Sequence, residues 1–283
     1  MDVNNVLKLA HNEHCMKVRA QYKMLEILFI VVIICLVLTF FYKQAVCEFR
    51  LNQIEWEQAG EKMGDLLTEK VPIIVRSRPP TAFWTQEDVH LRDIYSTVPI
   101  FDNQTLADWI MTATPDTVCP WTREHAGILA LRSVSGLEHW VDRALNPVIY
   151  GANMMVPFWL RPHSYCWAGG KGLWKTVAPW TAVFVSQGAI TITIMTDSVA
   201  SALPDVWEGV FPGALTSYDT PFVSDLKFVD IVLRPNSVLF MPAHWYVSWV
   251  AHGSGEDTIC PMVCTVEYHS PVSRFAEWAG GKK

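Results

Sequence analysis

Residues 180–195 read WTAVFVSQGAITITIM, and this stretch gives the clearest indication of the fold. Two apolar runs meet at a Ser-Gln-Gly turn at 186–188, and isoleucine alternates with threonine from 190 to 194. Alternation with a period of two buries one face of a strand, and a glycine-containing turn between two such runs is typical of a β-hairpin. The stretch therefore predicts two strands joined by a tight turn, with the isoleucines in the core.

Short β-prone runs recur along most of the chain after residue 70, separated by Pro, Gly, Asn and Ser. Besides the stretch above, they lie at 71–76, 228–233, 238–242, 245–250 and 260–268. Capping signals at Thr85 and at Thr105 with Asp108 predict two small helices that flank the first strands. Several short strands with regular turn signals favour a mainly β fold with flanking helices (α+β), in the form of a sandwich or barrel of the jelly-roll type.

The most apolar segment is residues 25–42, LEILFIVVIICLVLTFFY, in which Glu26 is the only charged residue. About 17–25 apolar residues are needed to cross the hydrocarbon core of a bilayer as a helix. The segment therefore predicts a transmembrane helix that acts as a signal-anchor in a single-pass membrane protein. A buried core helix and a cleaved signal peptide are the alternatives, although the tail before the segment is long for a signal peptide and no small-residue cleavage site follows.

The charges on either side of this segment predict its orientation. Residues 1–24 form a basic tail with four lysines and arginines against two acidic residues, whereas acidic residues accompany Lys43 and Arg50 beyond the span. The positive-inside rule then makes the N-terminus cytoplasmic and the C-terminal domain lumenal, exterior or virion-internal. Asn103 begins an Asn-Gln-Thr sequon, a candidate glycosylation site on that side.

Composition divides the rest of the chain in two. Residues 43–70 are rich in helix formers and charges, which predicts a helical stalk, and residues 71–283 form the folded domain. The chain is 51% hydrophobic and 18% charged, with 13 Trp and 13 Phe, so an aromatic-rich core is expected. The formal net charge of −6 argues against nucleic acid as a partner, because phosphate binding needs a basic surface.

The cysteines leave the pairing open. Five of the seven follow the apolar segment, and they are Cys47, Cys119, Cys166, Cys260 and Cys264. A lumenal domain could pair some of them, for example Cys119 with Cys166, but a sequence does not fix connectivity. Cys260 and Cys264 lack the further Cys or His of a zinc site. We interpret the cysteines as small buried hydrophobic residues.

Several segments follow one another in an order that is typical of a known family. They are VPIIVR at 71–76, VSQG at 185–188, Phe211-Pro212, RPNSVLFMPA at 234–243, and Trp245. This order resembles the JmjC-like branch of cupin domains over roughly residues 71–270, and the specific part is the segment that ends at Trp245. The resemblance implies a double-stranded β-helix, the cupin jelly roll, for the domain 71–283.

Active members of that family are Fe(II) and 2-oxoglutarate oxygenases, whose iron is held by a His-x-Asp/Glu pair and a distal His. The family's spacing puts the equivalents of these ligands at Lys175, Val177 and Val247. An ammonium and two isopropyl groups offer a metal ion no lone pairs, and residues 169–185 contain no His, Asp or Glu that a shifted alignment could use. The resemblance therefore implies a pseudoenzyme without a metal, a cofactor or catalytic residues.

Few other residues in the β-rich half suggest a site. The histidines there are His163, His244, His252 and His269, and no HxH, HExxH or His-x-Asp pattern occurs in the chain. The glycine cluster at 169–172 could cradle an anion but is typical of a turn. Four side chains would line or rim a cupin barrel as a possible ligand pocket: Trp174, Lys175, Trp180 and Trp245. Alternatively, the tryptophans fill the space that the metal and cosubstrate leave.

Three functions fit these observations. The preferred one is a membrane-anchored, non-catalytic cupin-like protein with a structural or protein-interaction role, as a virion or organelle membrane component. Its partners would be the membrane and another protein. The alternatives are a divergent Fe(II)/2-oxoglutarate-dependent oxygenase and a lumenal binding module for a glycan or other small ligand.

Overall fold

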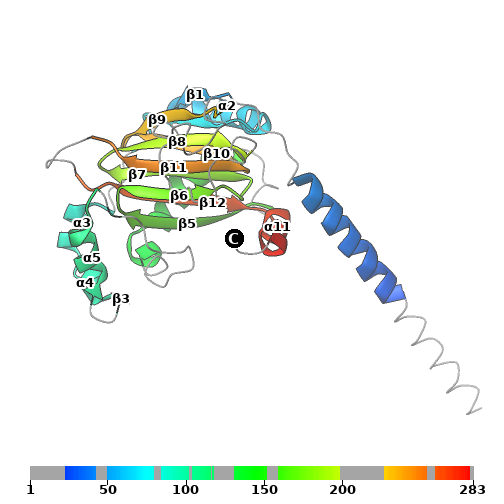
Figure 1. Ribbon diagram of the computed structural model, residues 1–283, viewed down its shortest axis with the longest axis horizontal. Helices are drawn as coiled ribbons and strands as arrows, with labels where there is room; N and C mark the ends of the chain where they lie inside the picture. The colour runs from blue at the N-terminus through cyan, green and yellow to red at the C-terminus, as the bar shows by residue number, and fades with distance from the viewer. Residues whose placement is uncertain are drawn as a thin grey trace, which may run out of the picture. The chain divides into compact units, whose positions relative to one another are not determined.

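The computed structural model describes residues 23–42, 50–79, 84–101, 104–115, 117, 131–151, 159–197, 226–253 and 259–280 (Figure 1). The chain divides into two compact units, one of residues 46–271 and one that combines residues 1–45 with 272–283. The larger unit carries all the described β-strands. The smaller one contains the apolar helix and most of α11 (Pro271–Gly280).

The apolar segment near the N-terminus forms one continuous helix, Lys23–Tyr42, with a mean hydropathy of 3.0. The hydroxyl of Thr39 donates to the carbonyl of Cys35 at 2.7 Å, so this polar group is satisfied within the helix, as it must be in an apolar medium. The expected helix over 25–42 is thus confirmed. Its length and composition suit a membrane span, a signal sequence or a core helix, and the crossing of a bilayer stays a prediction.

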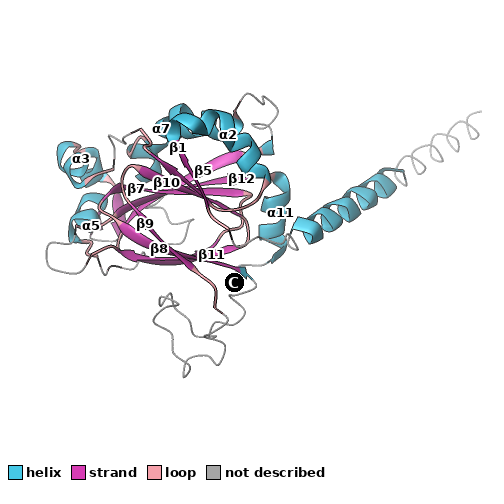
Figure 2. Ribbon diagram, turned by 90° about the horizontal axis from the view of Figure 1, so that it is seen from above, coloured by secondary structure: helices cyan, strands magenta, loops and turns pink. Residues whose placement is uncertain are grey.

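Two β-sheets form the larger unit, and Figure 2 shows them stacked as layers, with α2 and α7 on the outer face of one. The strands of the two sheets are β1 (Asn52–Glu55), β2 (Ile73–Arg76), β5 (Arg161–Ala168), β6 (Lys171–Lys175), β7 (Trp180–Gln187), β8 (Ile190–Thr196), β9 (Val229–Leu233), β10 (Ser237–Pro242), β11 (Trp245–Ala251) and β12 (Met262–His269). One sheet has the order β1-β2-β10-β7-β12-β5 and the other β6-β11-β8-β9. The expected mixture of α and β structure is confirmed.

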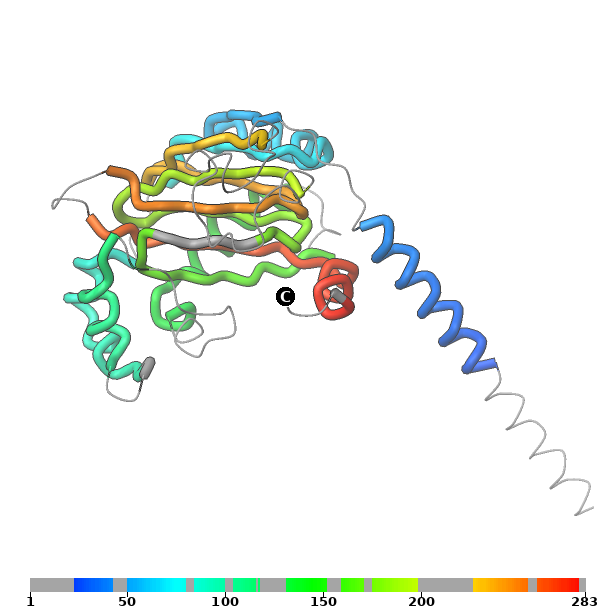
Figure 3. The backbone as a smooth tube through the Cα atoms, viewed as in Figure 1, coloured from blue at the N-terminus to red at the C-terminus, as the bar shows by residue number. Residues whose placement is uncertain are grey.

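The N-terminal edge of the larger sheet differs from the expectation of a helical stalk over 43–70. Residues 52–55 form β1, which pairs in parallel with β2, and the helix α2 occupies only Trp56–Thr68. Figure 3 shows both elements against the sheet. Met63 and Ala59 of α2 are buried, which explains the difference. Residues 52–68 are stabilised more by packing on the domain than they would be as a free, solvent-exposed helix. The domain therefore begins before residue 71.

The turn at 186–188 does not make a hairpin. β7 pairs with β10 and β12 in one sheet, whereas β8 pairs with β11 and β9 in the other. Gly188 has a φ of 75°, which suits a tight turn, and here the turn carries the chain from one layer to the next. Turn chemistry fixes the reversal but not the strand partners. The predicted strands are confirmed, and the predicted pairing between them is wrong.

Each face of the six-stranded sheet has its own neighbours. On the outer face, Phe184 packs on Trp140 with ring centroids 4.8 Å apart, and Tyr268 donates a hydrogen bond to Asn146 at 3.1 Å. On the inner face, Trp167 of β5 stacks on Trp249 of β11 at 5.3 Å. Because side chains alternate along a strand, these contacts assign the positions of β5, β7 and β12 to the helix layer or to the space between the sheets, except near the register shift at Met262 and Val263.

The helix layer and the small flanking elements are built from short segments. They are α3 (Gln86–Leu91), α4 (Ile94–Thr97), β3 (Pro99–Phe101), β4 (Gln104–Thr105), α5 (Leu106–Thr112), α7 (Leu137–Trp140), a π-helical turn η1 (Val141–Leu145) and α8 (Asn146–Tyr150). Thr85 caps α3, and Thr105 and Asp108 form a reciprocal capping box at α5. Both predicted helix starts are confirmed, because a capping motif is local in sequence.

The isoleucines of the opening stretch are buried as expected. Ile190, Ile192 and Ile194 have at most 1% of their surface exposed and belong to the hydrophobic core. Val247 and Trp249 of the neighbouring strand β11 lie in the same core. Burying side chains of this size contributes about 1.5–3 kcal/mol each, so this layer is a major source of the fold's stability.

Candidate functional site

The positions expected to replace the metal ligands do not converge. In the register of β6 and β11, Val247 pairs with Trp174 and Lys175 pairs with Tyr246, so Lys175 and Val247 lie on opposite faces of the sheet. Val247 is fully buried between the sheets. Val177 follows the end of β6 and is half-buried. Counting from Gly188 therefore misses the inner face of β6 by one residue, because spacing in a loop does not fix the phase of a strand.

Lys175 is engaged on the outer surface of the four-stranded sheet. Its ammonium lies 2.7 Å from the Asp197 carboxylate and 5.2 Å from the centre of the Tyr246 ring. An ion pair at this exposure contributes little to stability, about 0–1 kcal/mol. The residue is thus part of a surface cluster and not of the interior.

Thr176 directly follows β6 and lies on its inward-facing side. Its hydroxyl forms hydrogen bonds with backbone groups. It accepts a hydrogen bond from the Trp245 amide at 2.9 Å and donates to the Pro242 carbonyl at 2.8 Å. The His244 amide donates to the Thr176 carbonyl at 2.8 Å, and His244 itself has a φ of 68° in this turn. These bonds hold the end of β6 against the β10–β11 turn, so the role of the His244 backbone here is structural.

The four side chains proposed as a ligand pocket lie on different surfaces. Trp245 is buried between the sheets, on the face of Val247. Trp180 pairs with Tyr268 on the face that contacts the helices, and Lys175 is on the outer surface. The side chain of Trp174 lies outside the described part of the chain. Strand alternation separates the described members, so the pocket as predicted is not assembled.

A group of polar side chains that sequence reasoning missed lies between the sheets. Glu267 of β12 is the register partner of Thr181 on β7 and of His163 on β5, all on the face that carries Trp167. The Glu267 carboxylate is 3.1 Å from Nε2 of His269, and both side chains are 1% exposed. The His163 and His269 rings meet edge to face, with centroids 5.8 Å apart. We call Thr181, Thr265, Glu267, His269 and His163 the interior polar row.

Two hydroxyls of the interior polar row are buried without a hydrogen-bond partner among the described residues. They belong to Thr181, with no exposed surface, and to Thr265, with 2%. A buried donor left unsatisfied costs about 1–3 kcal/mol, so such groups usually contact a water molecule or a ligand. Thr265 lies two residues before Glu267 on the same face of β12. The row therefore places hydrogen-bond donors and acceptors next to one another on the inner face of β5, β7 and β12.

The sequence held a signal for this row. Thr265, Glu267 and His269 alternate with Val266 and Tyr268, so one side of a strand buried on both faces is polar. In the sequence, His163 and His269 stand out only as single residues, and Glu267 does not stand out at all. Their proximity depends on the pairing of β5, β12 and β7, which are far apart in sequence.

The remaining candidates have other roles or lie outside the described residues. His252 is exposed, with Nδ1 2.9 Å from the Thr191 hydroxyl. Gly170 leaves no room for a side chain, since a Cβ there would sit 1.5 Å from the carbonyl oxygen of Pro115, so a close backbone approach explains Gly169 and Gly170 better than an anion does. Asn103 and Cys119 lie outside the described residues. Within the described residues, no group of three His, Cys, Asp or Glu side chains could hold a metal ion.

Comparison with models of known protein families found no match to this chain, and comparison with curated proteins found none either.

Proposed function

We propose that the chain is a membrane-anchored, non-catalytic protein of the cupin-like type that acts through binding to another protein. The strand order supports the fold part of this proposal. Strands β5, β7, β10 and β12 share one sheet and β6, β8, β9 and β11 the other, so the chain changes sheet at nearly every connection. This alternation is what a double-sheet jelly roll of eight strands requires, with β1 and β2 added at one edge.

The observation that carries the non-catalytic part is the chemistry at the inner ends of β6 and β11. Thr176 there spends its hydroxyl on backbone groups, and Val247 is an alkyl side chain packed among Ile194 and Trp245. A facial triad of two imidazoles and a carboxylate would need these inward positions. Apolar packing in their place supports a domain whose interior serves stability.

The helix Lys23–Tyr42 supports the anchor. Its length and hydropathy meet the requirement for a span, and the basic residues that precede it favour a cytoplasmic N-terminus. The folded unit of residues 46–271 would then stand in a lumenal, exterior or virion-internal compartment. The partner protein would meet the domain at that membrane.

The full-length protein, purified in detergent from its own membrane, tests this proposal. We expect sub-stoichiometric iron by elemental analysis, no succinate from 2-oxoglutarate, and a cross-linked complex with one protein partner in intact membranes. An established Fe(II)/2-oxoglutarate oxygenase handled in parallel controls for metal loss. Iron at one atom per chain together with succinate formation would overturn the proposal in favour of the divergent oxygenase. Release of the chain from membranes by alkaline carbonate would overturn the anchor.

The interior polar row favours a second candidate function, a binding module for a small polar ligand. Two hydroxyls and one carboxylate would suit a molecule that donates several hydrogen bonds, such as a polyol or a small amine. Native mass spectrometry of the purified protein tests this. A bound molecule that the Thr193→Val protein retains and the Thr181→Val/Thr265→Val protein loses would favour the binding module. A wild-type protein with no bound molecule would exclude this candidate function.

A further inference from the structure

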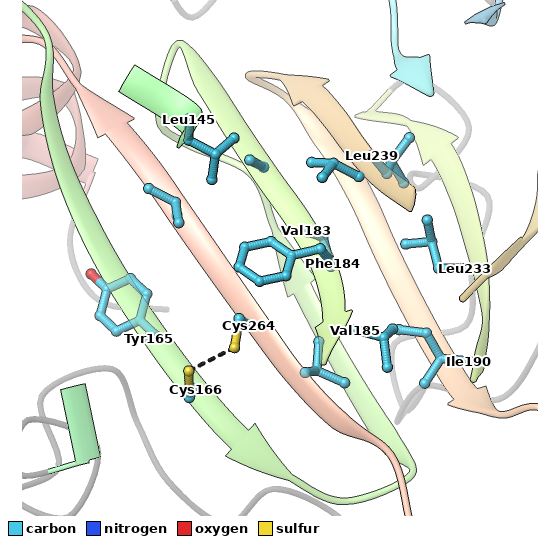
Figure 4. Packing of buried hydrophobic residues seen from close by; sticks show 14 of the residues in the cluster. Leu145, Tyr165, Cys166, Val183, Phe184, Val185, Ile190, Leu233, Leu239 and Cys264 are labelled. Atoms are coloured by element: carbon cyan, nitrogen blue, oxygen red, sulfur yellow. Dashed lines mark hydrogen bonds between the residues drawn. The ribbon is translucent and has the colours of Figure 1, made fainter. Parts of the chain in front are cut away.

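Two buried thiols face each other across neighbouring strands of the larger sheet. Cys166 of β5 and Cys264 of β12 are direct register partners, and their sulfur atoms are 2.7 Å apart (Figure 4). They are 98 positions apart in sequence. Neither side chain has any exposed surface. Both point to the face that carries Phe184 and the helix layer.

The register of this pair suits a disulfide. Directly opposed residues of antiparallel strands have Cα atoms about 4.5–5.5 Å apart, within the range of about 4.4–6.8 Å that disulfides span. The sulfur atoms need to approach only to the bond length of about 2.05 Å. A small rotation of the two side chains achieves this without moving a strand.

We propose that Cys166 and Cys264 form a cross-strand disulfide in the mature protein. The two thiols lose two protons and two electrons, and the electrons pass to the disulfide of a dithiol oxidoreductase, which leaves as a dithiol after a mixed-disulfide intermediate. The proposal needs an oxidising compartment around residues 46–271. In that respect it rests on the proposed topology.

Burial determines when the bond forms. Desolvation raises the pKa of the Cys166 thiol well above its usual range, so the folded domain holds almost no thiolate there. Thiol exchange requires the thiolate and access to it. The bond therefore forms while β5 and β12 are pairing and before the helices cover their outer face, and afterwards it is shielded from reductants.

The bond would secure the edge of the sheet. β5 is the last strand of this sheet, and β12 is its one neighbour among the described strands. Edge strands are also the part of a sheet most exposed to pairing with other chains. A covalent link between β5 and β12 fixes the register that brings Tyr165 and Trp167 into the core.

Cys260 is the matched control within the same region. It is buried, and desolvation raises the pKa of its thiol to about 11, and its sulfur lies 3.9 Å from the backbone carbonyl oxygen of Pro261. It shares the burial of the pair, and among the described residues no other cysteine is bonded to it. Its chemistry reports what a buried lone thiol does in this domain.

Peptide mapping of the full-length protein tests the proposal. The protein is taken from its native membrane, denatured in the presence of a thiol-alkylating reagent, and digested without reduction. We expect the Cys166 and Cys264 peptides to be linked to each other and the Cys260 peptide to be alkylated. Alkylation of both Cys166 and Cys264 without prior reduction would overturn the proposal.

Two further measurements distinguish a failure of the disulfide proposal from a failure of the proposed membrane topology and from misfolding of a variant. Protease protection on the same membranes reports the side of the domain, so free thiols in a protected domain reject the disulfide alone, and free thiols in a cytosolic domain reject the topology as well. Reductant reaches the bond once the domain opens during heating, so it should lower the Tm of the wild type and of Cys260→Ala by roughly 5–15 °C. It should leave that of Cys166→Ala/Cys264→Ala unchanged. If the double variant does not fold, the wild-type map decides.

Discussion

Thr181 and Glu267 are register partners on β7 and β12, and both are completely buried in the space between the two sheets. The carboxylate of Glu267 reaches His269 at 3.1 Å, whereas the hydroxyl of Thr181 has no hydrogen-bond partner among the described residues. A buried polar pair and an unused hydroxyl on adjacent strands are costly in an apolar core. The change in the free energy of unfolding when such a group is removed distinguishes an interior that only stabilises the fold from one that binds a ligand.

Replacement of Thr181 by valine measures this effect. Valine keeps the shape and removes the unsatisfied hydroxyl, so we expect Thr181→Val to raise the free energy of unfolding by about 1 kcal/mol in urea denaturation. Thr193→Val is the control, because Thr193 is equally buried but donates to Asp230 at 2.6 Å, and its loss should cost about 1 kcal/mol. Equal destabilisation by both changes would mean that a bound molecule satisfies Thr181.

Local patterns in the sequence were sufficient for several of the elements, although not for β1, β5 and β6. The alternation of Ile190, Ile192 and Ile194 identified a strand and its buried isoleucine face, and Thr105 with Asp108 identified a helix start. Each of these signals is contained within a few neighbouring residues, where sterics and hydrogen bonding act directly. Such features can be predicted without knowledge of the partners.

The site could not be predicted in the same way, because it depends on which distant strands pair and in which register. Lys175 was expected inside the domain, and a shift of one residue turns it to the outer surface. Glu267 passed unnoticed because its neighbours Thr181 and His163 come from strands that are distant in sequence. The same non-local pairing brings Cys166 opposite Cys264, a connectivity that the cysteine spacing left open.

The capping box of α5 should make the stability of the domain depend on pH. Hydrogen bonds from the Thr105 hydroxyl and amide to Asp108 lower the pKa of that carboxyl below its usual range. Its folded-state pKa is thus below the unfolded one, so its contribution is fully present above the unfolded pKa and is lost as the pH falls through the folded value. Asp108→Asn should destabilise at pH 7 and have less effect at pH 3, as measured by urea denaturation. A pH-independent difference would contradict the assignment.

Arg78 joins the helix layer to the sheet, and its replacement tests how that interface is held. Its guanidinium donates to the carbonyls of Val185 at 2.7 Å and Pro79 at 2.9 Å and lies over the Trp140 and Phe184 rings. Burial lowers the pKa of Arg78 to about 10, so it is still charged at pH 7. Lysine cannot reproduce the planar fork, and Arg78→Lys should cost about 1–3 kcal/mol in denaturant unfolding.

Arg76 provides the control for that change. It lies two residues earlier on β2 and is exposed, so Arg76→Lys should alter the free energy of unfolding by less than about 0.5 kcal/mol. An Arg78→Lys variant as stable as Arg76→Lys would show that the charge alone, and not the geometry of the guanidinium, holds the helix layer.

Gly170 offers the sharpest test of the packing around the β5–β6 turn. A Cβ atom there would lie 1.5 Å from the Pro115 carbonyl oxygen, a backbone atom that can move only if its segment moves, so Gly170→Ala should cost about 3 kcal/mol in denaturant unfolding. Gly64 lies exposed within α2 with no atom in reach of a Cβ, and Gly64→Ala should instead stabilise by about 1 kcal/mol. The two changes add the same methyl group. Changes of opposite sign in the free energy of unfolding would therefore show that the close contact with Pro115 causes the difference. A neutral Gly170→Ala would mean that this segment does not pack on the turn, and the glycine cluster would then again be available to bind an anion.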